Sequence, residues 1–240
     1  MKTYLVTGAT SGIGKALVCS FKNDDIQVIA IGRDKDKLEL LKDSFAPQKI
    51  TPLVIDLRDI SSISSQMHNI FPVQIDGFIH CAGYSVESSL RKLKIEKFQE
   101  MMTVNFFSFV EILRVLIANK SREKRLRVIA MSSQASLSAS GGVFMYSATK
   151  GALDSFVRSS SDELSKYCVE INTIQPVYVD TPMLESVKSF YGEKFVDFIH
   201  AHQPLGLIPV EDVVEQIRFL LEKKSKCVTG TSILMNAGKI

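Results

Sequence analysis

The feature that most constrains the fold is an alternation of short apolar runs with helix-like segments along the whole chain. The runs are continuous and β-rich rather than strictly alternating between apolar and polar residues, which is typical of strands that are buried on both faces. Strands of this kind separated by helices predict an α/β protein with a doubly wound, seven-stranded parallel sheet flanked by helices on both faces. The seven runs are residues 4–7, 26–31, 51–55, 77–81, 127–131, 170–175 and 232–236.

Length and composition fit a single domain over residues 1–240. The net charge of +3 is spread along the chain, so it indicates neither a nucleic acid nor a membrane partner. The four cysteines lie far apart, which predicts reduced thiols and no metal site. We also expect a cytoplasmic protein, because the sequence has no leader pattern and no uninterrupted apolar stretch of the roughly 20 residues that span a bilayer.

The first apolar run leads into a glycine loop, "TGATSGIGK", at residues 7–15. Five residues separate Gly8 from Gly14 and no Ser or Thr follows Lys15, so the loop lacks the spacing and the magnesium ligand of a triphosphate-binding P-loop. A loop that turns tightly into a helix instead suits the pyrophosphate of a dinucleotide. Leu17 stands where the usual dinucleotide pattern has a last glycine, and a structural turn without a ligand remains an alternative.

The pattern T-G-x-x-x-G-x-G at the first strand resembles the short-chain dehydrogenase/reductase family, single-domain Rossmann-fold enzymes of about this length. The resemblance extends to the segments that follow the third, fourth and sixth strands, and it implies a bound nicotinamide dinucleotide. The residues that it places at the cofactor are Gly8, Thr10, Ser11, Gly12, Ile13, Gly14, Arg33, Asp56, Leu57, Cys81, Ala82, Gly83, Tyr146, Lys150, Pro176, Val179 and Thr181.

Tyr146 and Lys150 are four residues apart and therefore share one face of a helix. An ammonium about 4 Å from a phenol contributes roughly 4 kcal/mol at an effective dielectric near 20, so we expect Lys150 to lower the pKa of Tyr146 by about three units. Tyr146 could then exchange a proton with a carbonyl or alcohol oxygen while Ser133 hydrogen-bonds that oxygen. The family resemblance adds Asn105, which supports a water chain to the lysine.

Two positions depart from the family pattern. His80 and Cys81 in "HCAG" replace two asparagines, and Val177 stands where a glycine often follows the proline. We expect His80 to be a packed residue at the end of a strand. Neither change affects the proton-transfer residues, so we expect an active enzyme. The alternative is a catalytically silent nucleotide-binding or scaffold protein of the same fold.

The end of the second strand bears on the choice of cofactor. Gly32 occupies the position where a carboxylate would bind both ribose hydroxyls, and Arg33, whose guanidinium suits a phosphate, follows it. We therefore expect NADP(H), although NAD(H) is possible. No metal is expected.

The resemblance implies a small-molecule carbonyl or alcohol substrate beneath a variable lid at residues 182–204. This lid carries Phe190, Tyr191, Phe195 and Phe198. The helix at residues 98–118 is apolar on nearly every face, which predicts self-association to a dimer or a homotetramer.

Overall fold

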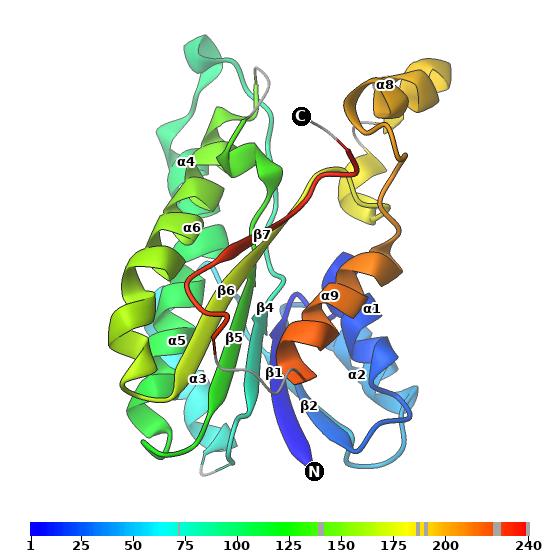
Figure 1. Ribbon diagram of the computed structural model, residues 1–240. Helices are drawn as coiled ribbons and strands as arrows, with labels where there is room; N and C mark the ends of the chain where they lie inside the picture. Colours follow the sequence, from blue (N-terminus) through cyan, green and yellow to red (C-terminus); the bar gives the residue numbers. More distant parts are fainter. Residues whose placement is uncertain (72, 139–141, 186–187, 190–191, 223–226, 239–240) are drawn as a thin grey trace.

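The computed structural model describes the chain except for residues 72, 139–141, 186–187, 190–191, 223–226 and 239–240. The seven predicted strands form one parallel sheet in the order β3-β2-β1-β4-β5-β6-β7, so the predicted doubly wound fold is confirmed (Figure 1). The strands are β1 (Lys2–Thr7), β2 (Ile26–Gly32), β3 (Ile50–Val54), β4 (Gly77–His80), β5 (Leu126–Met131), β6 (Val169–Pro176) and β7 (Ser232–Met235).

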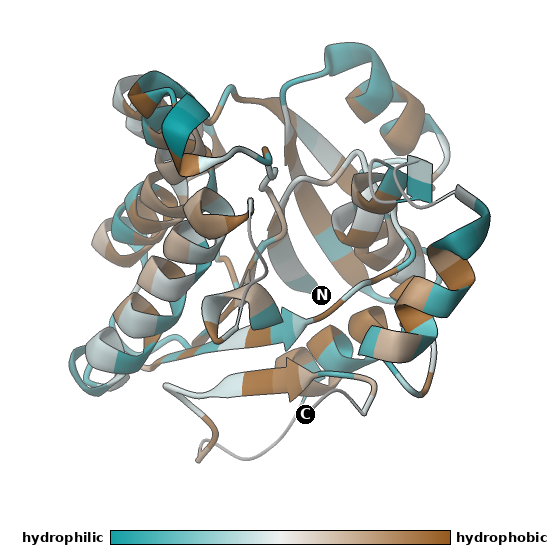
Figure 2. Ribbon diagram, turned by 90° about the horizontal axis from the view of Figure 1, so that it is seen from above, coloured by the Kyte–Doolittle hydropathy of each residue, from teal (hydrophilic) through white to brown (hydrophobic). Residues whose placement is uncertain are grey.

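Helices cover both faces of the sheet (Figures 1 and 2). One face is covered by α1 (Gly12–Ser20), α2 (Lys35–Asp43) and α9 (Val210–Glu222), and the other by α3 (Ile60–Met67), α5 (Ser108–Asn119) and α6 (Phe144–Ser165). The strands supply both cores, because successive side chains point to opposite faces. In β2, Val28 and Ala30 belong to the core beneath α1 and α9, whereas Ile29 and Ile31 belong to the core beneath α5 and α6.

The strand order reverses between β1 and β4, which are neighbours in the sheet. In a doubly wound sheet the crevice at such a switch point, beyond the carboxyl ends of the strands, is where ligands bind. The segments after β1, β4, β5 and β6 all begin at this edge. The α8 helix (Phe195–His202), within the predicted lid, lies beyond the same end of the sheet (Figure 1). Phe190 and Tyr191 of that lid lie outside the described residues.

The helix before β5 is continuous from α4 (Ile95–Met102) through a π-helical turn, η3 (Thr103–Phe107), into α5. By length and composition alone this helix could span a membrane, although charged residues such as Glu111 and Arg114 interrupt its apolar sequence. Its inner face, with Phe109, Ile112 and Leu116, packs in the core. Burial against the sheet is thus one reason for its apolar composition.

Candidate functional site

The glycine loop after β1 is held tightly against the loop that follows β4. Gly8 has a φ of +65°, and a Cβ there would lie 2.9 Å from the main-chain nitrogen of Ala82. At Gly14 a Cβ would lie 2.3 Å from the carbonyl oxygen of Gly8. Glycine is therefore required at both positions, by conformation at Gly8 and by close backbone approach at both.

This loop opens the amino terminus of α1 toward the site. Ser11 is the N-cap residue, yet within the described residues its side chain makes no capping hydrogen bond, and the first turn contains no acidic residue. Unpaired N–H groups and the helix dipole favour an anion at such a terminus. Thr181, from the segment after β6, lies against the loop, since a Cβ on Gly12 would be 3.7 Å from its side chain.

Ser133, Tyr146 and Lys150 meet beyond the end of β5. The Ser133 hydroxyl lies near enough to the Tyr146 phenol to lower its pKa. It accepts a 3.1 Å hydrogen bond from the Ala135 amide at the start of η4 (Gln134–Ser136) and donates a 3.5 Å hydrogen bond to the Pro176 carbonyl. Lys150 is only 3% exposed, and its Nζ lies 5.4 Å from the centroid of the Tyr146 ring. The spacing of Tyr146 and Lys150 places both on α6 as predicted.

The pKa values at this site differ from the expectation. Burial raises the pKa of Tyr146 to about 12, and the neighbouring Ser133 hydroxyl lowers it only in part. Burial also lowers the pKa of Lys150 to about 8. The predicted lowering of the tyrosine pKa was wrong for this structure, because the Lys150 ammonium donates its 2.7 Å hydrogen bond to the Met131 carbonyl oxygen and desolvation dominates.

Asn105 fixes the loop after β4 to the neighbouring helices. Its side chain is fully buried in the π-helical turn, where Oδ1 accepts from the Tyr84 amide and Nδ2 donates to the Tyr84 carbonyl, each at 3.0 Å. Nδ2 also donates to the Thr149 hydroxyl at 3.0 Å. A Cβ on Gly83 would lie 3.3 Å from Asn105 Oδ1 and 3.5 Å from Lys150 Nζ, so this loop passes directly over the lysine.

His80, one of the two departures from the family pattern, is fully buried at the end of β4. Its Nδ1 lies 2.9 Å from the Thr7 hydroxyl, which also accepts a 3.2 Å hydrogen bond from the Ala82 amide. Desolvation, with a further contribution from Lys150, lowers the pKa of His80 to about 3. His80 is thus a neutral, packed residue that ties β1 to the loop after β4.

The other departure, Val177, causes no backbone strain. Non-glycine residues with positive φ in the described part of the chain are Gln48, Cys168 and Ala237, so Val177 is not among them. Its amide donates a 3.1 Å hydrogen bond to the Met235 carbonyl on β7. A glycine is therefore not needed at this position in this chain.

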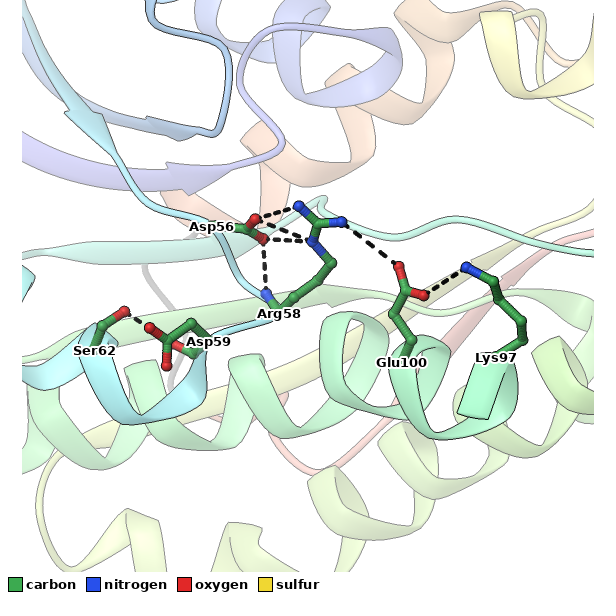
Figure 3. A network of polar contacts seen from close by, with 6 residues as sticks. All are labelled: Asp56, Arg58, Asp59, Ser62, Lys97 and Glu100. Atoms are coloured by element: carbon green, nitrogen blue, oxygen red, sulfur yellow. Dashed lines mark hydrogen bonds and ion pairs between the residues drawn. The ribbon is translucent and has the colours of Figure 1, made fainter. Parts of the chain in front are cut away.

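A salt-bridge network lies after β3, at the far end of the predicted cofactor site (Figure 3). Asp56 accepts hydrogen bonds from the main-chain amide and the guanidinium of Arg58, which hold the pKa of its carboxyl below the usual range. Arg58 also lies 4.0 Å from Glu100 on α4, which pairs with Lys97 at 2.9 Å. Sequence reasoning assigned Asp56 to an adenine amino group but missed this pairing with Arg58.

Arg33 is exposed and makes no ion pair with any described residue, although its charge acts on Asp56. The carboxylate next to it, Asp34, caps α2 through a 3.1 Å bond from the Lys37 amide. A Cβ on Gly32 would lie 3.2 Å from the Thr10 side chain, so a larger residue there would crowd the loop.

Gln203 is a second residue that sequence reasoning missed. It is fully buried just after α8, and its carboxamide bonds both main-chain groups of Tyr178, accepting from the amide at 2.9 Å and donating to the carbonyl at 3.1 Å. It also donates to the Gly206 carbonyl at 3.1 Å. Gln203 thereby fixes the end of the lid segment to the stretch that contains Pro176, Val179 and Thr181.

Comparison with known proteins identifies the family. The family model described as short chain dehydrogenase matches residues 2–192. A 3-oxoacyl-(acyl-carrier-protein) reductase FabG of Buchnera aphidicola is 26% identical over 239 residues, which cover 99% of this chain and 96% of that protein. L-xylulose reductase of Mus musculus is 28% identical over 239 residues, which cover 98% and 94%.

Two solved structures share the fold. ElxO with NADP bound has a TM-score of 0.88 at 23% identity, and 4-hydroxyisoleucine dehydrogenase complexed with NADH has a TM-score of 0.90 at 22% identity. Each comparison covers 99% of this chain and 98% of that structure. With the family match over most of its length, the chain belongs to the short-chain dehydrogenase family of oxidoreductases.

Proposed function

We propose that this protein is an NADP(H)-dependent oxidoreductase that interconverts a carbonyl group and a secondary alcohol of a small molecule. The observation that carries the proposal is the neighbouring pair of hydroxyls, Ser133 and Tyr146, beside the Lys150 ammonium at the same sheet edge as the glycine loop. The two relatives named above are both reductases by name.

The residues around the glycine loop fit a nicotinamide dinucleotide. The glycines of the loop have no Cβ atoms, so a pyrophosphate could approach the backbone closely. The N–H groups at the amino terminus of α1 and the Ser11 hydroxyl, which makes no capping hydrogen bond, could then bind it. Thr181 lies against the glycine loop, and Val179 precedes Thr181 in the chain. Both would border the nicotinamide, while Asp56 and Leu57 would border the adenine. Known structures with the same fold bind NADP in one case and NADH in another.

The proposed chemistry assigns a separate task to each side chain. A bound nicotinamide would supply or accept the hydride. Tyr146 donates its phenolic proton to the carbonyl oxygen, and Ser133 hydrogen-bonds the same oxygen. With a pKa of about 12, Tyr146 is protonated at neutral pH, which is the state that reduction requires. In the oxidation direction Tyr146 must accept a proton, and the Lys150 cation favours the phenolate that forms.

Preference for NADP(H) is the part of the proposal that depends on Arg33. Its guanidinium is exposed and not engaged in an ion pair with a described residue, and Arg58 brings a second guanidinium to the same end of the site. The nearby carboxylates, Asp34 and Asp56, are hydrogen-bonded to Lys37 and Arg58. A 2′-phosphate would therefore meet unpaired positive charge rather than a free carboxylate.

The experiment that tests this proposal is a fluorescence titration of the purified protein with NADPH and NADH. We expect Arg33→Ala to weaken NADPH binding by about tenfold or more, from the loss of a charged hydrogen bond, and to leave NADH binding little changed. Arg122→Ala, before β5 and so at the opposite end of the sheet, is the matched control. If neither nucleotide binds to the wild type, the non-catalytic alternative replaces this proposal.

The remaining parts of the proposal concern organisation. Residues 182–204 would act as the substrate lid of a single-domain cytoplasmic enzyme. Phe107, in the π-helical turn, is 47% exposed, and we propose that this outer face of the long helix takes part in a dimer or tetramer interface. Light scattering of the purified protein tests the oligomer.

A further inference from the structure

Asp154 is a buried acid for which the proposed reaction gives no role. It lies in α6 one helical turn after Lys150 and is 4% exposed. Its Oδ2 accepts a 2.7 Å hydrogen bond from Nε2 of Gln175 on β6. Its Oδ1 is buried and has no hydrogen-bond partner among the described residues. A buried carboxylate with an unpaired oxygen is strongly unfavourable unless an opposite charge nearby compensates it.

Lys150 has the complementary need, since its buried ammonium requires a negative charge. The other titratable groups beside it are His80 and Cys81, at the end of β4, and Tyr146 on α6 itself. Burial holds the pKa of His80 at about 3 and raises the pKa values of Cys81 and Tyr146 to about 12, so all three are neutral near pH 7. Within the described part of the chain, Asp154 is thus the source of negative charge at Lys150.

Gln175 fixes the position of the Asp154 carboxylate relative to the reacting groups. It is 3% exposed, and the same Nε2 that donates to Asp154 donates to the Ser136 hydroxyl at 3.0 Å. Ser136 in turn donates to the Ser133 carbonyl at 2.8 Å. Both amide hydrogens of Gln175 are therefore used, which leaves its side chain no other orientation with the same bonds.

We propose that Asp154 is a positioning residue that keeps Lys150 protonated in its buried site, with Gln175 holding the carboxylate in place. Asp154 acts through Lys150 and does not touch the reacting atoms. The inference rests on the proposed function for the role of Lys150, and it extends that function by one residue. Burial lowers the pKa of Lys150 to about 8, and Asp154 is the largest contribution that opposes this effect.

The test is a pH titration of Lys150 by NMR in protein labelled with ¹³C at lysine Cε, with the signal assigned by its absence from Lys150→Met. Asp154→Asn keeps an oxygen acceptor for Gln175 but removes the charge, so we expect the titration midpoint to fall by about one pH unit or more. Asp154→Glu retains the charge and should keep the midpoint of the wild type. Asp162 is on the same helix, and its carboxylate is 92% exposed. Asp162→Asn should therefore leave the titration midpoint of Lys150 unchanged.

An unchanged midpoint in Asp154→Asn overturns the proposal. If that variant does not fold, thermal unfolding of Lys150→Met is compared with that of Lys150→Met/Asp154→Asn. Without the lysine the carboxylate is an uncompensated buried charge, so the double variant should unfold at the higher temperature. A lower temperature would show that Asp154 has only a structural role. Neither measurement uses cofactor or substrate, so failure of the proposed function would be seen separately, in the nucleotide titration.

Discussion

Acid should destabilise this protein through His80, by an amount that follows from its burial. The pKa of His80 falls from 6.5 to about 3 on folding, mainly through desolvation and further through Lys150. Between these two values the unfolded chain binds a proton that the folded protein excludes, so stability falls as the pH falls through this window. The free energy of unfolding should drop by about 2 kcal/mol at pH 5, and by about 5 kcal/mol over the whole window.

Urea unfolding of the wild type and of His80→Asn at pH 7 and pH 5 measures this effect. Asparagine is the residue that the family pattern has at this position, and it does not titrate. We expect the wild type to lose about 2 kcal/mol more than His80→Asn between the two pH values. Any loss of packing in the variant is present at both pH values and cancels in the comparison. Equal pH dependence in the two proteins would refute the reasoning.

Three further predictions concern other parts of the site. The rate of carbonyl reduction should fall as the pH rises through about 8, because Lys150 then loses its proton, and initial rates that stay constant through this range would contradict this. Gly14→Ala places a Cβ 2.3 Å from the Gly8 carbonyl oxygen, so fluorescence titration should show nucleotide affinity reduced by about tenfold or more. Gly151→Ala, where a Cβ meets no atom within 4 Å, should keep the affinity of the wild type. Gln203→Leu should lower the free energy of unfolding by about 2 kcal/mol and speed hydrogen exchange at the Tyr178 amide, which loses its acceptor. Exchange at Tyr178 as slow as in the wild type would contradict this.

The sheet could be predicted from the sequence because most strands are continuous apolar runs between polar segments, although β6 also carries buried polar side chains. The observed strand from Ile26 to Gly32, for example, extends the predicted run by one residue. The shared helix face of Tyr146 and Lys150 was also predictable, since four residues make about one helical turn. These inferences depend only on local spacing, which the sequence contains.

Contacts between distant residues could not be predicted in the same way. Asp154 and Gln175 are 21 positions apart and meet only because α6 packs on β6. The bonds of Asn105 to Tyr84 depend on a π-helical turn that no local pattern signals. The pKa of Tyr146 was predicted wrongly because an assumed 4 Å approach of Lys150 left out desolvation and the competing Met131 carbonyl.

The most direct test of the account is to measure NADPH oxidation against a panel of small ketones and aldehydes with the wild type and with Tyr146→Phe. We predict that the wild type reduces at least one carbonyl compound. Tyr146→Phe should bind NADPH equally well but reduce that compound at least about a hundredfold more slowly. A reaction that proceeds at the same rate in Tyr146→Phe would contradict the assignment of Tyr146 as the general acid.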